Sequence, residues 1–329
     1  MSGDKLLLDV RNLKIYFYIE QGIVRAVDGI NFSLNKGKSL GIVGESGCGK
    51  TVTALSLMLL HPQPEGRIVE GNIYYYANGD KPLDIAKLNP YGREIRNIRG
   101  NEITMIFQEP MMSLNPVYTI GNQIMEAVLL HQKVDKEQAR KIAIESLKRV
   151  NISNPEERID QYPFQLSGGL RQRVMIALAL SCNPAILIAD EPTTALDVTI
   201  EAQILMLIKE LQKEYGMSII FITHDLGVIG EITDEVIVMY VGHVVERAKT
   251  ITLFEKPMHP YTKALFNSRP EIGKEGRVTS IRGTVPSPYL LPKGCVFEPR
   301  CDVSMDICRK KEPCVYNKDG HYVNCWKYS

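Results

Sequence analysis

The octapeptide GESGCGKT, Gly44 to Thr51, constrains the fold of this chain more than any other segment. It matches the pattern G-x-x-x-x-G-K-[ST], follows the apolar stretch LGIVG, and opens an expected apolar helix over Thr51–Leu60. Glycines let successive backbone N–H groups face one anion, and a helix start adds partial positive charge. The sequence therefore predicts a nucleotide-phosphate site between a buried strand and a helix.

The phosphate loop suggests a role for each of its residues. We expect Lys50 to bring its charge to the β- and γ-phosphates and the Thr51 hydroxyl to ligate Mg²⁺. The remaining ATP-binding positions are Gly44, Ser46, Gly47, Cys48 and Gly49. Cys48 is interpreted as a small filler residue, although a thiol at this position could make ATP hydrolysis sensitive to oxidation.

The stretch ILIADE supplies the second half of such a site. Asp190 ends a buried apolar strand, where a carboxylate needs a strong partner, and a Mg²⁺ ion is the expected one. Glu191 is placed to polarise the attacking water as a general base. The alternative is a carboxylate pair that caps the turn before Pro192.

The arrangement of apolar segments predicts an α/β fold with a parallel sheet. Short β-rich runs near the N-terminus indicate an antiparallel β-subdomain, and helical periodicity from Thr119 to Val150 indicates a helical subdomain at about 112–182. Prolines recur after Leu253 with few periodic runs. We therefore expect a first domain over 1–252 and a small, irregular, Cys-rich extension over 253–329.

Composition excludes several classes of protein. The chain has 329 residues and a formal net charge of +1, so no basic excess points to nucleic acid. No secretory signal or membrane-length apolar run is evident, which places the chain in the cytosol, where disulfides are disfavoured.

The stretch LSGGLRQRVMIALAL, Leu166 to Leu180, closely resembles the signature motif of ABC-type ATPases. The resemblance implies a P-loop NTPase core of the ABC-cassette type. It also implies that Ser167, Gly168 and Gly169, with Asp197 of the ALD motif, reach the ATP held by a partner subunit.

Further positions follow from the same resemblance. Gln108 in IFQEP matches the residue that touches ATP and Mg²⁺, and His224 in FITHD matches the switch histidine that contacts the γ-phosphate. Phe17, or its neighbour Tyr16, sits where the family stacks an aromatic ring on adenine. Either aromatic residue could instead belong to the core.

Three stretches narrow the resemblance to the ATPase subunits of oligopeptide and dipeptide importers: GESGCGKT, FQEPMMSLNPVYTIGNQI and HPYTKAL. This implies an ATP-hydrolysing motor at the cytoplasmic face of the membrane. Two transmembrane permease subunits and an extracytoplasmic peptide-binding protein would be its partners, with no nucleic acid. Leu170 replaces the usual glutamine of LSGGQ, as an apolar residue does in one of the two paired ATPases of such importers. The resemblance therefore also implies a second, non-identical ATPase.

Other functions remain open at this point. Related importers move nickel or other small solutes, and some ABC ATPases are soluble proteins of DNA repair or translation. The latter usually carry coiled-coil insertions or two cassettes, and this chain has neither sustained heptads nor a basic tract. A redox sensor is a further possibility because of the cysteine-rich tail.

Five of the seven cysteines crowd into the last 35 residues or so. Their gaps are wider than those of zinc knuckles and suit the four thiolates of a [4Fe–4S] cluster. The resemblance selects Cys295, Cys301, Cys308 and Cys325 as ligands and leaves Cys314 as an extra. Zinc, with His321 as a competing ligand, and plain free thiols are the alternatives.

Overall fold

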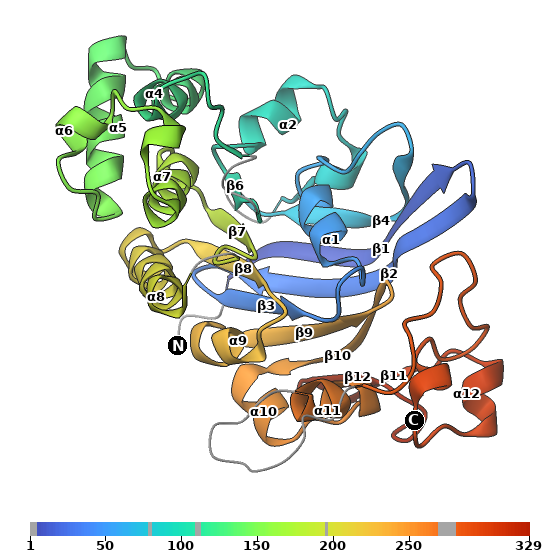
Figure 1. The fold of residues 1–329 in the computed structure, drawn as a ribbon. Coiled ribbons are helices and arrows are strands. Elements are labelled where there is room, and N and C mark those ends of the chain that lie inside the picture. The colour runs from blue at the N-terminus through green and yellow to red at the C-terminus, as the bar shows by residue number, and fades with distance from the viewer. Residues whose placement is uncertain (1–4, 78–80, 109–112, 195–196, 269–280) are drawn as a thin grey trace.

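The computed structural model describes residues 5–77, 81–108, 113–194, 197–268 and 281–329, and these ranges form two β-sheets with helices around them (Figure 1). The larger sheet has the strand order β11-β12-β10-β9-β3-β8-β7-β6. In chain order its strands are β3 (Ser39–Val43), β6 (Ile103–Ile106), β7 (Ile186–Asp190), β8 (Ser218–Ile222), β9 (Glu235–Tyr240), β10 (His243–Lys249), β11 (Val315–Lys318) and β12 (His321–Asn324).

The centre of this sheet is parallel, as the apolar runs predict. β3 pairs in parallel with β8 and β9, and β7 pairs in parallel with β6 and β8. Every residue of β3, β7 and β8 is buried, which is the pattern of strands covered on both faces. The carboxyl ends of these strands carry the phosphate loop, Glu191 and His224, so the topology brings them to one edge.

The smaller sheet is the expected antiparallel β-subdomain, with strand order β2-β1-β4-β5. Its strands are β1 (Leu6–Ile19), β2 (Gly22–Asn35), β4 (Gly66–Tyr75) and β5 (Leu83–Asp84). Leu8 and Val10 of β1, and beyond a register shift Leu13 and Ile15, are buried in a core that also includes Ile42 of β3 and Ala54 of α1. This core joins the two sheets.

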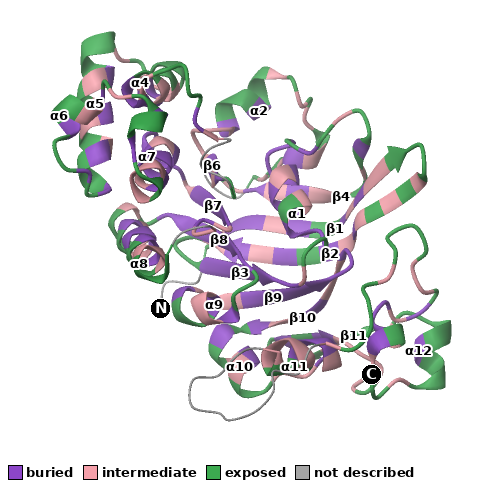
Figure 2. Ribbon diagram, in the orientation of Figure 1, coloured by how far each residue is buried: buried purple, intermediate pink, exposed green. Residues whose placement is uncertain are grey.

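The helices lie around the two sheets, and most of them bury one face while exposing the other (Figure 2). They are α1 (Lys50–Ser56), α2 (Arg93–Ile98), α4 (Ile120–His131), α5 (Lys136–Arg149), α6 (Pro155–Arg158), α7 (Gly168–Leu180), α8 (Val198–Tyr215), α9 (Leu226–Ile232), α10 (Thr250–Glu255), α11 (Pro260–Asn267) and α12 (Asp306–Lys310), with short 3₁₀ turns η1 (Ile85–Lys87), η2 (Pro163–Gln165) and η3 (Glu298–Arg300). The helix α1 ends at Ser56, before the Leu60 expected from its apolar run, because the chain turns at Leu59, whose φ is +52°.

The region predicted as a helical subdomain, about 112–182, contains the helices α4 to α7 (Figure 1). Asp135 caps α5 as expected, since its carboxylate accepts a hydrogen bond from the Gln138 backbone N–H. Ala139, Ala143 and Leu147 recur at intervals of four and are fully buried. Tertiary packing of one apolar stripe therefore holds this subdomain together.

The C-terminal extension is less separate than its composition predicts. Its hairpin β11–β12 continues the large sheet, because β12 pairs with β10 through Glu246↔Val323 and Arg247↔Tyr322. The alternation in this hairpin is too short to be recognised as a strand pair in the sequence. The extension therefore has its own irregular segments but shares a sheet with the first domain.

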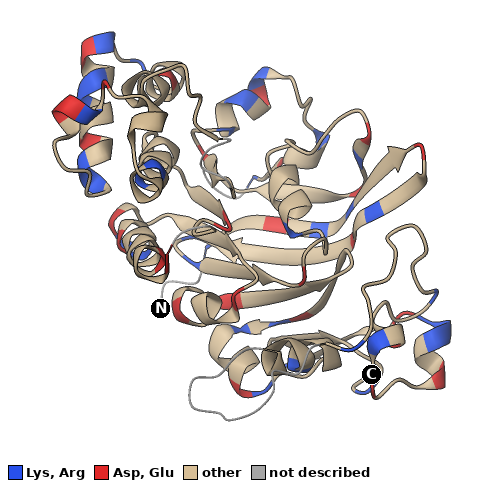
Figure 3. Ribbon diagram, in the orientation of Figure 1, with Lys and Arg blue, Asp and Glu red and all other residues tan. Residues whose placement is uncertain are grey.

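Basic and acidic side chains are interspersed over the helical subdomain and the C-terminal extension (Figure 3), which agrees with the near-zero net charge. None of the helices in the described ranges combines the length and apolar character that crossing a bilayer requires.

Candidate functional site

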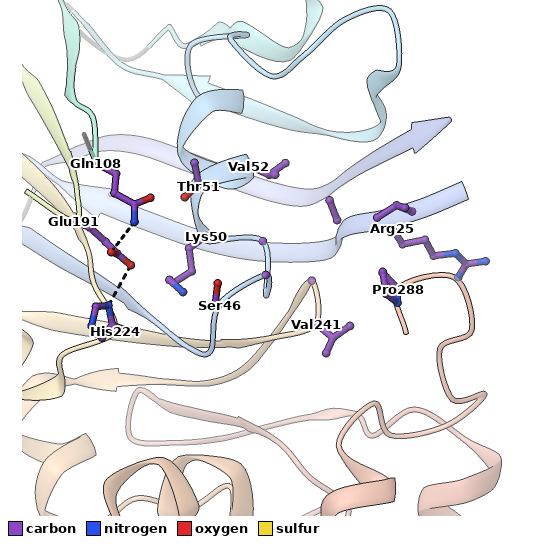
Figure 4. A pocket seen from close by; sticks show the side chains of 15 residues that line it. Arg25, Ser46, Lys50, Thr51, Val52, Gln108, Glu191, His224, Val241 and Pro288 are labelled. Carbon is purple, nitrogen blue, oxygen red and sulfur yellow. Dashed lines mark hydrogen bonds and ion pairs between the residues drawn. The ribbon is translucent and has the colours of Figure 1, made fainter. Parts of the chain in front are cut away.

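A cavity of about 650 Å³ opens at the carboxyl edge of the parallel strands. Gln108, Glu191 and His224 lie at one end, the phosphate loop lies in the middle, and Arg25 and Pro288 lie at the other end (Figure 4). The lining residues are Val24, Arg25, Ala26, Ser46, Gly47, Gly49, Lys50, Thr51, Val52, Gln108, Glu191, His224, Val241, Gly242 and Pro288.

The phosphate loop has the conformation that its sequence predicts. Gly49 directly precedes α1 with a φ of +100°, and a Cβ there would clash with the backbone carbonyl of Ala26, so only glycine fits. The Lys50 ammonium is buried within the loop and donates hydrogen bonds to the carbonyl oxygens of Gly44 at 2.8 Å and Glu45 at 3.1 Å. A fixed positive charge and a helix start thus meet on one wall of the cavity.

Glu191 is the centre of a hydrogen-bonded group. Its Oε2 accepts from Gln108 Nε2 and from Thr194 Oγ1, both at 3.0 Å, and its Oε1 lies 3.2 Å from His224 Nδ1. Its φ of +45° is left-handed, a conformation that non-glycine residues adopt at a cost and that recurs at functional sites. The structure thus brings together three residues that are 83 and 33 positions apart in the sequence.

Asp190 is 2% exposed, and its Oδ1 atom has no hydrogen-bond partner within the described residues. Burial raises the pKa of this carboxyl, whereas a hydrogen bond from the Thr51 hydroxyl opposes the rise. An unsatisfied buried carboxylate beside a hydroxyl suits a hard cation such as Mg²⁺, which prefers oxygen ligands. The set Thr51, Gln108 and Asp190 therefore fits the expected ion, although Asp190 does not itself line the cavity.

Cys48 is 3% exposed, and burial raises the pKa of its thiol. A buried thiol with a raised pKa carries little thiolate and reacts slowly with oxidants. This environment favours the interpretation of Cys48 as a filler residue over that of an oxidation-sensitive thiol.

Neither aromatic residue considered for adenine stacking lines the cavity. The Tyr16 hydroxyl donates to Asp28 Oδ1 at 2.8 Å, and the Tyr16 ring lies 5.6 Å from the guanidinium of Arg25. Phe17 packs against the core of the β-subdomain. The alternative that these rings are structural agrees with the geometry, and Tyr16 supports Arg25, which does line the cavity.

The residues expected to reach a partner's ATP lie outside this cavity and close to one another. Ser167 caps α7 and Asp197 caps α8, each accepting a hydrogen bond from a backbone N–H of its helix. A Cβ added at Gly169 would lie 3.2 Å from Ile200, so the starts of the two helices are in contact. Ser167, Gly168 and Asp197 are exposed, whereas Ala195 and Leu196 of the ALD motif lie outside the described residues.

The cysteines of the C-terminal extension are free thiols. The pKa of Cys295 is raised to about 11, chiefly by burial, and the neighbouring thiols of Cys308, Cys325 and Cys301 contribute to the rise. The four predicted ligands are thus near enough to interact, and Cys314 is exposed. However, no group of three or more His, Cys, Asp or Glu side chains in the described ranges is arranged to hold a metal ion. The geometry therefore gives the cluster and the zinc alternative no direct support.

His321 is turned to a different partner. It is buried, and its Nε2 lies 2.6 Å from Oε1 of Glu246, a residue with no exposed surface. This pairing gives His321 a structural partner in place of a metal at Nε2.

Arg25, Val241 and Pro288 are cavity residues that sequence reasoning missed. Each comes from a segment with no phosphate-binding motif, and Pro288 lies more than 200 residues from the phosphate loop in the chain. The stretch SPYL around Pro288 has the composition of a turn, but a turn by itself does not indicate a ligand-binding position.

Comparisons with known proteins agree with this geometry. Residues 27–194 match a family described as ABC transporter, and residues 245–308 match the C-terminal region of oligopeptide/dipeptide transporters. The oligopeptide transport ATP-binding protein AppD of Bacillus subtilis (strain 168) is 50% identical over 98% of this chain and 97% of that protein. The dipeptide transport ATP-binding protein DppD of the same organism is 48% identical over 97% of this chain and 94% of that protein.

A solved structure supports the fold. The ATP-binding cassette MJ0796, in a dimeric post-hydrolysis state bound to ADP and Pi, superposes with a TM-score of 0.64 and 28% identity. The match covers 74% of this chain and 99% of that one.

Proposed function

The chain belongs to the ABC transporter family, as an ATP-binding subunit of the oligopeptide/dipeptide type, and we propose that it hydrolyses ATP to drive import of di- and oligopeptides. The observation that carries this proposal is the sequence identity of 48–50% to transporter subunits of that type, which extends over nearly the whole chain and includes the C-terminal region. The cavity that joins Lys50 to Glu191 supplies the ATP-hydrolysing site.

In this proposal each site residue has a chemical role. The phosphate loop binds ATP, Lys50 neutralises the β- and γ-phosphates, and His224 contacts the γ-phosphate. Thr51, Gln108 and Asp190 would hold Mg²⁺, which supplies charge neutralisation on the phosphates. Glu191 orients and deprotonates the attacking water, and its hydrogen bonds to Gln108 and His224 fix its carboxylate in the cavity.

A second ATPase subunit completes the motor. Ser167, Gly168, Gly169 and Asp197 contact the partner's ATP, which favours a closed pair only when ATP is bound. Leu170 marks the pair as two non-identical subunits. Closing and reopening of this pair couple ATP hydrolysis to movement of the transmembrane permease subunits.

The transmembrane permease subunits dock on an apolar groove of about 210 Å³ between β6 and α7, within the first domain. The groove is lined by Phe107, next to Gln108, and by Met175, Leu178 and Ala179 of α7. A short permease helix with an apolar face is its proposed occupant, since the groove joins the nucleotide site to α7. Bound in this way, the ATPase chain is a peripheral subunit on the cytoplasmic face of the membrane.

We also propose that the chain divides into an ATPase domain over 1–252 and a C-terminal extension over 253–329. A further proposal is a [4Fe–4S] cluster in this extension, with the ligands Cys295, Cys301, Cys308 and Cys325. Four neighbouring thiols from one small segment are the chemical basis for the cluster. Anaerobic purification followed by iron, sulfide and zinc analysis tests it. Zinc or no metal at all would refute the cluster.

The transported solute is tested with the complete complex, reconstituted in vesicles with its binding protein. Import of labelled dipeptides and longer peptides is expected, with no import in the Lys50→Ala variant. Leu178→Arg should leave ATP binding intact and abolish binding of the permease. ATP hydrolysis stimulated only by a binding protein loaded with Ni²⁺ would instead establish the nickel alternative.

A further inference from the structure

Glu45, the second residue of the phosphate loop, is bound by a residue of the C-terminal extension. Arg300 Nη1 lies 2.6 Å from Glu45 Oε2, and Arg300 Nη2 lies 3.1 Å from Glu45 Oε1. The pair is bidentate and joins positions 255 residues apart. The Arg300 side chain is 4% exposed and the Glu45 side chain is 26% exposed, so the ion pair is partly shielded from water and from salt.

Arg300 is itself held in place from several sides. Its Nε donates to the carbonyl oxygen of Arg282 at 2.9 Å, and its Nη1 donates to the Tyr240 hydroxyl at 3.3 Å. Its guanidinium also lies 5.7 Å from the centre of the Tyr240 ring. A buried guanidinium fixed in this way is a rigid anchor for the carboxylate.

A second residue holds the backbone of Glu45. The Tyr261 hydroxyl accepts a hydrogen bond from the Glu45 N–H at 2.9 Å. Tyr261 is fully buried, and its ring packs against Tyr240 at 4.7 Å and Phe297 at 5.4 Å between centroids. It lies in the first turn of α11, which His259 caps and Pro260 opens.

Glu45 also contacts the lysine of the phosphate loop. Its carbonyl oxygen accepts from Lys50 Nζ at 3.1 Å and from the Cys48 backbone N–H at 3.3 Å. Contacts therefore run from Arg300 and Tyr261, through Glu45, to Lys50. Neither Arg300 nor Tyr261 lines the cavity, so neither is placed to touch ATP.

We infer that Arg300 and Tyr261 are positioning residues, which hold Glu45 by its carboxylate and its N–H and thereby fix the phosphate loop in its ATP-binding conformation. The C-terminal extension is then a working part of the nucleotide site. The inference depends on ATP binding at the phosphate loop and not on the identity of the transported solute.

A purely structural role for the same contacts makes a different prediction. If Arg300 only fastens the extension to the first domain, its loss lowers thermal stability and leaves ATP affinity unchanged. If Arg300 is a positioning residue, its loss must weaken ATP binding and raise the KM for ATP. Lysine at this position should restore part of the affinity, because it keeps the positive charge but cannot form the bidentate pair.

The test measures binding of a fluorescent ATP analogue, KM and kcat for ATP, and melting temperature in the purified full-length chain. Arg300→Gln and Tyr261→Phe are expected to weaken binding, by about 10-fold for Arg300→Gln, with Arg300→Lys between it and wild type. Arg282→Gln is the matched control, because it removes an 85% exposed arginine that pairs with Asp302 in the same extension. It should leave analogue binding, KM, kcat and melting temperature unchanged.

A double-mutant cycle with Glu45→Gln separates the two roles. If Glu45 and Arg300 act together, the double variant Glu45→Gln/Arg300→Gln should bind ATP no more weakly than whichever single variant has the lower ATP affinity. Unchanged ATP affinity in Arg300→Gln, or additive losses in the double variant, would overturn the inference. If Arg300→Gln does not fold, Tyr261→Phe and Arg300→Lys decide by the same criteria. Lys50→Ala must abolish binding in every case, and its failure to do so would refute the ATP site rather than the positioning residues.

Discussion

Gln108 donates a hydrogen bond to the carboxylate of Glu191 at 3.0 Å, and the two residues follow neighbouring parallel strands of the large sheet. Gln108 follows β6 and Glu191 follows β7, so the parallel pairing of these strands sets the distance between the two side chains. A shift in the segment after β6 therefore moves the group that orients Glu191.

Glu191→Gln should retain ATP binding and lose hydrolysis by about 10²-fold or more, because glutamine keeps the shape and cannot accept a proton. Single-turnover hydrolysis and ATP-dependent dimer formation measure the two effects. Glu210→Gln, at an exposed position of α8, is the control. Turnover like that of wild type in Glu191→Gln would remove Glu191 from the general-base role.

Asp190→Asn should stabilise the Mg²⁺-free protein at neutral pH. Burial raises the pKa of Asp190, so the native state loses stability as pH rises from about 3.8 through that raised pKa, and asparagine removes this loss. The same variant should lose the increase in melting temperature that Mg²⁺ and ATP give the wild type. An equal increase in both proteins would show that Asp190 does not hold the ion.

Ser167→Asp should block the closed pair while keeping the helix. Aspartate caps a helix as well as serine does, so α7 should remain folded, but its charge would face the partner's ATP. ATP-dependent dimerisation, measured by light scattering, should disappear while ATP binding by the isolated chain persists. Asp135→Ser, the reverse exchange at the cap of α5, should leave dimerisation unchanged.

His259→Asn should make the protein more resistant to acid. Burial lowers the pKa of His259 to about 3, so the folded state excludes a proton that the unfolded chain binds below pH 6.5. Stability is therefore lost as pH falls below that value, by about 1.4 kcal/mol per pH unit. Urea unfolding at about pH 7.5 and about pH 5 should show a smaller loss in the variant, since asparagine also caps helices. Equal losses would contradict the role of His259.

Local signals in the sequence were sufficient for most of the fold. The phosphate loop, the strand before Asp190 and the capped helix after Asp135 each carry their information within about 15 residues, at the periods of strand and helix. The parallel orientation of the central strands agrees with their buried, uniformly apolar character.

Relationships between distant segments were not predictable in this way. The pairing of Arg300 with Glu45 depends on where α11 and the hairpin β11–β12 place the extension, and no local pattern records it. The wall of the cavity near Arg25 and Pro288 depends likewise on packing, which left Tyr16 behind Arg25 rather than in the cavity. The spacing of the cysteines left the choice between an iron–sulfur cluster, zinc and free thiols open, because that choice depends on how the thiols are arranged in space.

The pairing of β12 with β10 means that the C-terminal extension cannot be removed without exposing new surface. A shortened chain ending after β10 would leave that strand as an open sheet edge, available for pairing with other copies. It would also leave Glu246, which has no exposed surface, without His321 and the N–H groups of Met258 and His259. A chain stripped to its nucleotide-binding domain should therefore aggregate rather than work as a minimal motor.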